Sequence, residues 1–157
     1  MADVVSPEVR SRMMSGIQGK NTKPELFLRK GLHAEGFRFR IHVALPGKPD
    51  MVFPKWNAVL FVHGCFWHGH DCHLFKWPSS RPEFWRAKIS GNVIRDEANI
   101  ARLLEAGWRV GIVWECAVKG RTRLDSSRAI ASCSKWLISN RKRFELAGAQ
   151  NASRTSV

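Results

Sequence analysis

A run of potential metal ligands between His63 and His73 constrains the fold of this chain more than any other feature. The run reads HGCFWHGHDCH, and it contains four of the six histidines and two of the four cysteines. It directly follows the apolar segment 58–62 and shows neither helical nor strand periodicity. An irregular segment of this kind needs an additional element to fix its shape, and a bound metal ion can provide it. We therefore expect a loop that is organised around a metal.

Cysteine and histidine are typical ligands of structural Zn²⁺, which takes four ligands in a tetrahedron. Three candidates lie within eight residues, and a fourth follows the apolar segment 108–114. These candidates are Cys65, His70, Cys72 and Cys116. His68 and His73 are rival ligands at this stage. Cys133 lies in a predicted helix, where we expect a small buried apolar residue.

The charge of the chain indicates a polyanionic partner. Lys and Arg number 26 against 13 acidic residues, which gives a net charge of +13. Because 44% of the residues are hydrophobic, this charge decorates a folded body rather than a disordered basic tail. No apolar run approaches the roughly 20 residues that span a bilayer, and the N-terminus has no apolar signal region. We therefore expect a cytoplasmic protein that binds nucleic acid and not a membrane.

Hydrophobic periodicity predicts a mixed three-layer α/β fold. Helices are expected from Ser6, over 22–36, over 82–106 with a break near Gly91, and over 125–144. Strands are expected over 37–43, 50–53, 58–62 and 108–114. The domain prediction is an N-terminal DNA-contacting arm over 1–20, a single domain over 21–146, and a disordered tail over 147–157.

Asp50 is the first candidate catalytic carboxylate. It follows Pro49, and twelve residues later the neighbouring predicted strand ends at Val62. A Pro-Asp pair beside a strand that ends in polar residues resembles the PD-(D/E)xK nucleases, in which such a carboxylate holds magnesium against a phosphate. The second half of that motif is missing here. Pro-Asp is also common in ordinary turns, so this alternative stays open.

Asp96 and Glu25 are the other unusual acids. Asp96 shares a face with three apolar residues of the predicted helix 82–106, and an acid in that position costs free energy unless it is paired. Either a function or a salt bridge to Arg95 or Arg109 explains it. Glu25 has a structural explanation as the acidic half of a capping box that begins at Thr22.

Six stretches of the sequence together resemble the very short patch repair (Vsr) endonucleases. They span about residues 1–120 and read RMMSGI (12–17), LPGKPD (45–50), VHGCFWH (62–68), EFW (83–85), WRV (108–110) and VWEC (113–116). The region from Leu124 onward matches only loosely. The resemblance implies a restriction-endonuclease-like core with a degenerate PD-(D/E)xK motif. It also implies an enzyme that nicks double-stranded DNA 5′ to the thymine of T:G mispairs, which arise when 5-methylcytosine deaminates.

The same resemblance implies catalytic roles for particular residues. Asp50 would bridge two Mg²⁺ ions, with the backbone carbonyl of Val62 as a further ligand. His68 corresponds to the catalytic histidine that replaces the usual lysine. Three supporting groups around the water shell of the metal would be Glu25, His63 and Asp96.

Zinc binding and DNA binding follow from the resemblance in the same way. One structural Zn²⁺ would be held by Cys65, His70, Cys72 and Cys116. Phe66, Trp67 and Trp85 match aromatic residues that wedge into the duplex beside the mispair, and Met14 belongs to the DNA contacts of the N-terminal arm. A core role for Trp85 is the alternative, because it lies in a predicted helix.

We therefore predict a Mg²⁺-dependent mismatch endonuclease that acts as a monomer at the bacterial nucleoid. Its partners would be double-stranded DNA with a T:G mispair and general mismatch-repair proteins. Two rival functions remain at this stage: a restriction-like nuclease that cuts perfect duplexes, and a non-catalytic DNA-binding module stabilised by zinc.

Overall fold

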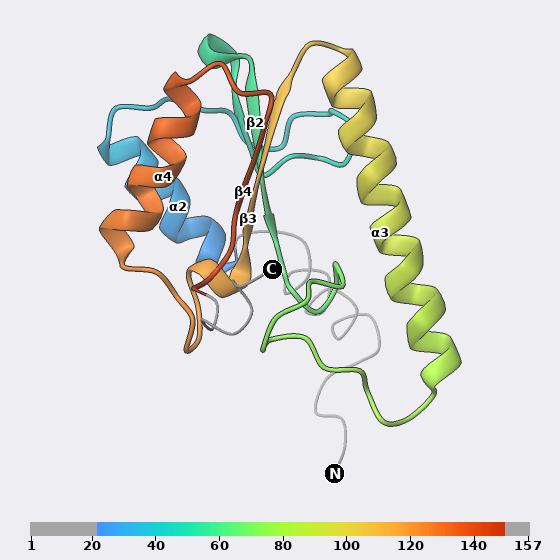
Figure 1. The fold of residues 1–157 in the computed structure, drawn as a ribbon. Coiled ribbons are helices and arrows are strands. Elements are labelled where there is room, and N and C mark those ends of the chain that lie inside the picture. Colours follow the sequence, from blue (N-terminus) through green and yellow to red (C-terminus); the bar gives the residue numbers. More distant parts are fainter. Residues whose placement is uncertain (1–21, 150–157) are drawn as a thin grey trace, which may run out of the picture.

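A four-stranded sheet with helices on both faces organises residues 22–149, the part of the chain that the computed structural model describes (Figure 1). Along the chain the elements are α2 (Lys23–Ala34), β1 (Met51–Phe53), the 3₁₀ turn η1 (Pro54–Trp56), β2 (Ala58–His63), α3 (Pro82–Glu105), β3 (Arg109–Trp114), the 3₁₀ turn η2 (Glu115–Ala117), α4 (Ser126–Ile138) and β4 (Arg143–Leu146). The strand order is β1-β2-β3-β4. β1 runs antiparallel to β2, and the other neighbouring pairs are parallel. The predicted mixed three-layer α/β architecture is confirmed.

Both faces of the sheet are covered by helices. Helices α2 and α4 cover one face and α3 covers the other (Figure 1). Under α2 and α4 the core includes Leu60 and the fully buried Trp136, and under α3 it includes Phe61 and Leu103. This alternation along β2 is expected for a strand whose successive side chains point to opposite faces. None of the helices within 22–149 is long and apolar enough to cross a membrane.

One edge of the sheet gathers the ends of three strands. In the parallel pair β2–β3, His63 is opposite Trp114, so both strands end at the same level. In the antiparallel pair β1–β2, Met51 is opposite Leu60, so β1 begins near the same edge. Ligands commonly bind beyond the carboxyl ends of parallel strands in open α/β sheets. The edge therefore brings Asp50, His63 and η2 into one region.

The predicted strand over 37–43 is wrong in extent. Only Arg40 pairs with the sheet, through two backbone hydrogen bonds to Val52 of 2.8 and 2.9 Å. His42 has a φ of 60°, a left-handed conformation that interrupts an extended strand. The alternation still marks apolar residues that face the core, since Phe37 and Phe39 both pack against Phe53.

The predicted break at Gly91 is also wrong, because α3 is continuous over 24 residues. A single glycine inside a helix costs only about 0.5–1 kcal/mol relative to alanine. The helical pattern continues on both sides of it, so the helix passes through. It ends at Glu105, just before the predicted stop at Gly107.

The last predicted helix ends earlier than expected, and its final residues form a strand. α4 ends at Ile138, and Arg143–Leu146 form β4, which pairs in parallel with β3. The ring of Phe144 stacks on Trp136 at 5.3 Å. The side chain of Arg109 lies at this junction and donates hydrogen bonds to several backbone carbonyls, those of Trp56, Trp136, Leu137 and Arg141.

The predicted helix from Ser6, the arm 1–20 with Met14, and residues 150–157 of the predicted tail lie outside the described residues. The first three residues of that tail, 147–149, are held by hydrogen bonds. The amide of Gly148 donates to Cys116 Sγ at 3.3 Å, and the amide of Ala149 donates to the Thr122 carbonyl at 2.8 Å.

Arg109→Ala should lower the free energy of unfolding by about 2–4 kcal/mol, because it removes a charged donor from several carbonyls at once. Arg109→Lys should recover little of this loss, since an ammonium group cannot reproduce the planar fork of donors. Urea denaturation followed by tryptophan fluorescence measures both effects. Arg141→Ala is the control, since that side chain is exposed and only its carbonyl is used. Full stability of Arg109→Lys would contradict this role.

Candidate active site and metal centre

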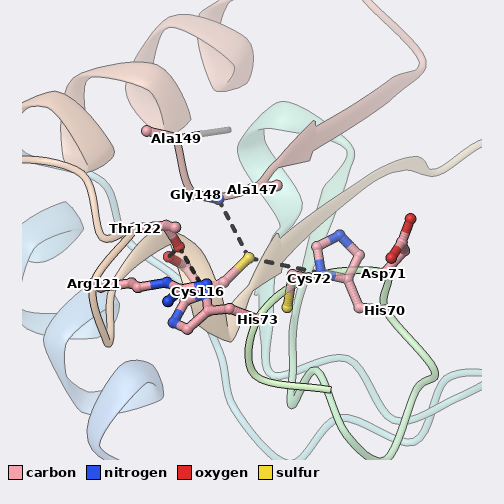
Figure 2. A pocket seen from close by; sticks show the side chains of 10 residues that line it. All are labelled: His70, Asp71, Cys72, His73, Cys116, Arg121, Thr122, Ala147, Gly148 and Ala149. Carbon is pink, nitrogen blue, oxygen red and sulfur yellow. Dashed lines mark hydrogen bonds between the residues drawn. The ribbon is translucent and has the colours of Figure 1, made fainter. Parts of the chain in front are cut away.

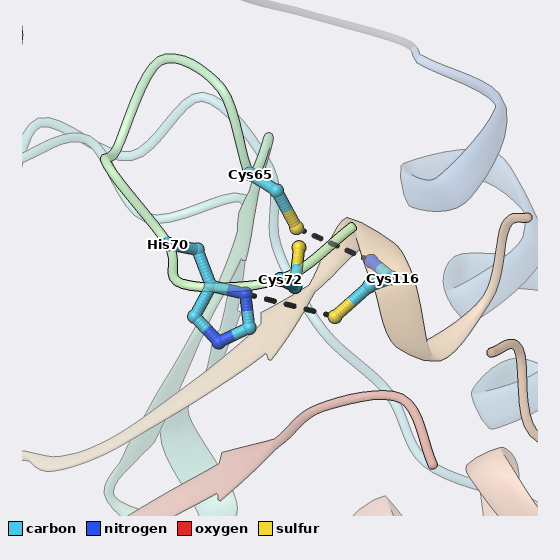
Figure 3. A group of neighbouring side chains, drawn as sticks. All are labelled: Cys65, His70, Cys72 and Cys116. Atoms are coloured by element: carbon cyan, nitrogen blue, oxygen red, sulfur yellow. Dashed lines mark hydrogen bonds between the residues drawn. The ribbon is translucent and has the colours of Figure 1, made fainter. Parts of the chain in front are cut away.

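The Cys/His cluster, which consists of Cys65, His70, Cys72 and Cys116, is the group predicted as zinc ligands (Figure 3). Three members come from the irregular loop 64–80, and the fourth comes from η2 at the end of β3. Their four ligand atoms all lie within 4.8 Å of one another, so they could hold a metal ion. The rival ligands His68 and His73 are not members of this group.

Backbone amides support the sulfur atoms of the Cys/His cluster. The amide of Cys116 donates to Cys65 Sγ at 3.4 Å, and the amide of Gly148 donates to Cys116 Sγ at 3.3 Å. Glu115 Oε1 accepts from the amide of Cys65 at 3.2 Å, which fixes the start of the loop. Burial raises the pKa of the Cys65 and Cys116 thiols. A metal ion would have to displace the thiol protons, and N–H donors favour the thiolates that then result.

A pocket of about 570 Å³ opens beside the Cys/His cluster (Figure 2). Residues 147–149 form part of its wall together with Arg121 and Thr122. The Thr122 hydroxyl donates to the Cys116 carbonyl at 3.2 Å and lies 3.4 Å from His73 Nδ1. The segment after β4 is therefore part of the surroundings of the cluster, which the sequence analysis missed.

A second group consists of His63, His68 and Asp96. The rings of His63 and His68 are parallel and 3.8 Å apart, and His68 Nδ1 lies 2.5 Å from Asp96 Oδ2. The alternative salt bridges from Asp96 to Arg95 or Arg109 are not formed. Asp96 is half-buried, and its partner on the loop resolves the unfavourable placement of an acid on an apolar stripe.

His63 is neutral at physiological pH. Burial lowers its pKa to about 3, and the charge of His68 adds to this effect while Asp96 opposes it. His63 packs between the rings of Phe61 and Trp114, at 5.3 Å from each. Its position is therefore fixed by aromatic neighbours at the end of β2.

Asp50, Glu25 and the backbone of Val62 form the third group. Asp50 Oδ2 accepts from the amide of Val62 at 2.6 Å, so the carboxylate lies beside the residue whose carbonyl is the predicted ligand. Burial first, and then the nearby Glu25 carboxylate, raise the pKa of Asp50 well above its usual range, against the opposing Val62 hydrogen bond. A carboxylate pair of this kind, with Glu25 buried and Asp50 half-buried, is a suitable place for a divalent cation.

Glu25 lies both at the start of α2 and beside Asp50. Its amide donates to Thr22 Oγ1 at 3.3 Å, which is part of the predicted capping box. Its carboxylate is buried, accepts from Arg29 Nη2 at 2.7 Å and lies next to Asp50. The cap orients the first turn of α2 toward the edge of the sheet at which β1 begins.

The three predicted wedge residues are in mutual contact. The Phe66 ring lies 5.1 Å from Trp67 and 5.4 Å from Trp85, and the two tryptophans are 6.0 Å apart. All three are partly exposed, so Trp85 is not a buried core residue. The side chain of Asn92 on α3 donates to the Trp67 carbonyl at 2.8 Å and ties this part of the loop to the helix.

Three further rings extend this surface and were missed in the sequence. They are Phe75, Trp77 and Phe84. Trp77 and Phe84 are 47% and 44% exposed, which is unusual for such large apolar side chains. Arg86 lies over the Trp77 ring and Arg81 over the Phe84 ring. The sequence did contain a signal for these three rings, because they are large aromatic residues within and just after the non-periodic segment.

Trp114 joins the Cys/His cluster to the histidine group. Its ring stacks on His70 at 4.1 Å and meets His63 edge-on at 5.3 Å. The indole N–H donates to Glu145 Oε1 on β4 at 2.8 Å. Sequence reasoning placed Trp114 in a buried strand but gave it no role in the site. It missed Glu145, which lies just after the predicted helix over 125–144 and belongs to the unpredicted strand β4.

Known proteins resemble this chain over most of its length. The family described as DNA mismatch endonuclease Vsr matches residues 2–74. The DNA mismatch endonuclease Vsr of Escherichia coli is 46% identical over 138 residues, which cover 87% of this chain and 88% of that protein. The type II nicking enzyme V.XorIIP of Xanthomonas oryzae is 47% identical over 127 residues, with coverage of 80% and 93%. V.NmeAIP of Neisseria meningitidis is 43% identical over 122 residues, with coverage of 77% and 87%. The chain therefore belongs to the DNA mismatch endonuclease Vsr family and is a DNA endonuclease.

Proposed function

We propose that this endonuclease hydrolyses one strand of double-stranded DNA 5′ to the thymine of a T:G mispair, with Mg²⁺ as cofactor. The observation that carries the proposal is the composition of one loop. His68, paired with Asp96, follows directly after Phe66 and Trp67, so a candidate base and a candidate wedge share one element. We further infer that the fold is a restriction-endonuclease-like core with a degenerate PD-(D/E)xK motif.

Asp50 and the backbone carbonyl of Val62 would hold the Mg²⁺ ions, of which we propose two. Carboxylate and carbonyl oxygens are the ligands that Mg²⁺ prefers. The raised pKa of Asp50 beside Glu25 reflects two carboxylates that repel each other, and a cation in place of the proton would relieve this repulsion. When bound, Mg²⁺ would stabilise the charge that develops on the phosphate and on the leaving oxygen. Glu25 and His63 would orient water molecules around it.

His68 would take the proton from the attacking water. The contact between Asp96 Oδ2 and His68 Nδ1 favours an imidazole proton on Nδ1, which would leave Nε2 free to accept. Asp96 thereby orients the ring and stabilises the imidazolium that forms. Imidazole is a common general base in reactions at neutral pH.

We propose that the Cys/His cluster holds one structural Zn²⁺. Three sulfurs and one imidazole nitrogen are a typical donor set for tetrahedral zinc. The ion would fasten the loop 64–72 to the end of β3, and with it the segment that carries His68. The histidine and the aromatic residues would then be held on one rigid support.

Phe66, Trp67 and Trp85 would insert beside the mispair. A wobble pair costs less to unstack than a Watson–Crick pair, so insertion favours mismatched sites. The net charge of +13 would supply phosphate affinity that is independent of sequence. Met14 and the arm 1–20 would add DNA contacts. We further propose a monomer in the bacterial cytoplasm, at the nucleoid, that works with general mismatch-repair proteins.

The proposed function is tested by nicking of labelled duplexes that differ only in one base pair. With Mg²⁺, the T:G duplex should be cut in the thymine strand, immediately 5′ to the mispair. The matched C:G duplex should be cut at least about a hundredfold more slowly. This ratio is expected when one base pair changes the free energy of binding and distorting the DNA by several kcal/mol. Equal cutting of both duplexes indicates a nuclease for perfect DNA, and binding without cutting indicates a DNA-binding module.

Asp50→Asn should reduce Mg²⁺-dependent nicking to background, because it keeps the size of the side chain but removes the charge that holds the cation. Binding of the T:G duplex should persist or become tighter, since a negative charge near phosphate is lost. Gel-shift and nicking assays on the same preparation separate the two effects. Asp125→Asn, at an exposed position before α4, is the control. Substantial nicking by Asp50→Asn would refute the assignment.

Cys116→Ala should remove the zinc from the purified protein and lower its thermal midpoint, because binding of structural zinc is coupled to folding. Cys133→Ala is the matched control, since Cys133 is also buried but lies in α4, outside the Cys/His cluster. Elemental analysis should give one zinc per chain for the wild type and for Cys133→Ala. Soluble and active wild-type protein that contains no zinc would rule out this site.

Trp67→Ala should weaken binding to the T:G duplex by about 1–3 kcal/mol, the range for one base stacked on an aromatic side chain. The loss should be smaller for the C:G duplex, into which the ring inserts less readily. Trp56→Ala is the comparison, because Trp56 packs against the core residue Phe37 and should affect stability rather than binding. Equal losses of binding in both variants would indicate that Trp67 has only a structural role.

A further inference from the structure

The N-terminal part of α3 projects past the edge of the sheet at which β2 and β3 end (Figure 1). At a rise of about 1.5 Å per residue, the 24 residues of this helix are about 36 Å long. A strand of six residues such as β3 spans only about 20 Å. Because α3 ends at Glu105, four residues before β3 begins, its excess length lies at the other end. The first turns of α3 therefore lie beyond the carboxyl ends of the strands.

Two large rings are exposed at this end of the molecule, and an arginine lies over each of them. Trp77 is 47% exposed and Phe84 is 44% exposed. The guanidinium carbon of Arg86 lies 5.6 Å from the centre of the Trp77 ring, and that of Arg81 lies 4.3 Å from the centre of the Phe84 ring. Both arginines are exposed as well. Trp77, Arg81, Phe84 and Arg86 are called the flank patch below.

The flank patch is continuous with the three wedge candidates. The Phe75 ring lies 5.8 Å from Phe66 and 4.9 Å from Trp77, so Trp77 is no more than about 11 Å from Phe66. On the other side, Phe84 contacts the wedge candidate Trp85 at 5.1 Å. A distance of 11 Å corresponds to about three steps of 3.4 Å along a DNA duplex. A duplex whose mispair meets Phe66 would therefore pass the flank patch within about three base pairs.

The charge around the flank patch fits DNA better than it fits a protein partner. Residues 75–90 contain one acidic side chain, Glu83, and four basic ones. The basic residues are Lys76, Arg81, Arg86 and Lys88, and all four are exposed. Protein–protein interfaces are depleted in lysine. Surfaces that follow a nucleic-acid backbone combine basic and aromatic side chains, as this one does.

We propose that the flank patch binds the sugar–phosphate backbone of the same duplex, within about three base pairs of the mispair. The guanidinium groups of Arg81 and Arg86 contact phosphates, and the rings of Trp77 and Phe84 pack against deoxyribose. The rings also hold the arginines in place through cation–π contacts. Unlike the wedge, such contacts are independent of the mispair, because every base pair carries the same backbone. The location beside the mispair rests on the proposed function, whereas the phosphate contact itself does not.

The phosphate contact is tested by measuring binding to T:G and C:G duplexes over a range of salt concentrations. Arg86→Ala should weaken binding to both duplexes by the same factor. It should also reduce the slope of log K against log salt by about 0.9, the value for one phosphate. The double variant Arg81→Ala, Arg86→Ala should reduce the slope by about twice this amount. Trp77→Ala should weaken binding to both duplexes at least about threefold, the size of an exposed cation–π contact.

The matched control is Arg128→Ala, because Arg128 is an exposed arginine on α4, which covers the opposite face of the sheet from α3. Its salt slope should be that of the wild type. An equal reduction for Arg128→Ala would show that only the net charge matters and would overturn the proposal. Unchanged binding of both duplexes by Arg86→Ala and Trp77→Ala would overturn it too, and so would a loss confined to the T:G duplex. Wild-type protein that dimerises in the absence of DNA, but not as Trp77→Ala, would show that the flank patch binds a second copy instead.

The location is tested with T:G duplexes that each carry one uncharged methylphosphonate within three base pairs of the mispair. At one linkage, the replacement should weaken binding of the wild type and have no further effect on Arg86→Ala, since both changes remove the same contact. Equal losses for both proteins at every linkage would overturn the location. If the wild type nicks no T:G duplex, the proposed function fails, while the salt slopes still decide whether the flank patch contacts phosphate.

Discussion

The attachment of the loop 64–80 to the end of β3 is the constraint on which the rest of the site depends. This loop has no helix or strand of its own, and its residues between Cys65 and Cys72 include His68 and two of the three wedge candidates, Phe66 and Trp67. The Cys/His cluster joins it to η2, and amides of Cys116 and Gly148 point at the sulfur atoms. Coordination bonds to a metal ion can fix the conformation of an irregular segment that buries too little apolar surface to be ordered by packing alone. The loop is therefore attached to the end of β3 through the Cys/His cluster and to α3 through Asn92 and Asp96.

The sheet brings the remaining residues of the site together at the ends of its strands. Because β2 and β3 are parallel and end at the same level, His63 and Trp114 lie side by side, and the loop and η2 begin there. β1 enters the same edge in the opposite direction and brings Asp50 against the backbone of Val62. Trp114 then packs against His70 on one side and His63 on the other. Three groups of side chains thus lie at one edge of the sheet: the sulfur-rich Cys/His cluster, the imidazoles of His63 and His68 with Asp96, and the carboxylates of Asp50 and Glu25. No residue belongs to more than one of them.

The local patterns of the sequence predicted much of the fold and pointed to side chains that the structure brings together, whereas the misses depend on long-range contacts. The helix over 22–36 and the strands that became β1 to β3 follow from periodicity. Residue type pointed to the four members of the Cys/His cluster but left His68 and His73 as rivals, and the family resemblance selected among them. β4 was missed because four residues of alternating burial do not define a strand until β3 is there to pair with them. The partner of Asp96 was missed because His68 is 28 residues away and reaches it only through the folded loop. The apparent break at Gly91 was misleading because the cost of one glycine is small against the packing of a long helix.

Hydrogen–deuterium exchange with metal-loaded and metal-stripped protein tests most directly whether a metal in the Cys/His cluster holds this loop. Peptides that cover 64–75 should lose protection on metal removal, and their exchange should accelerate by about tenfold or more, as expected when a local unit opens on its own. Peptides from β2 and β3 should change far less, since the hydrogen bonds of the sheet and the apolar side chains on both of its faces hold them whether or not a metal is bound. Identical exchange of residues 64–75 in the two forms would show that the loop is held by other contacts and would contradict the central role of the cluster.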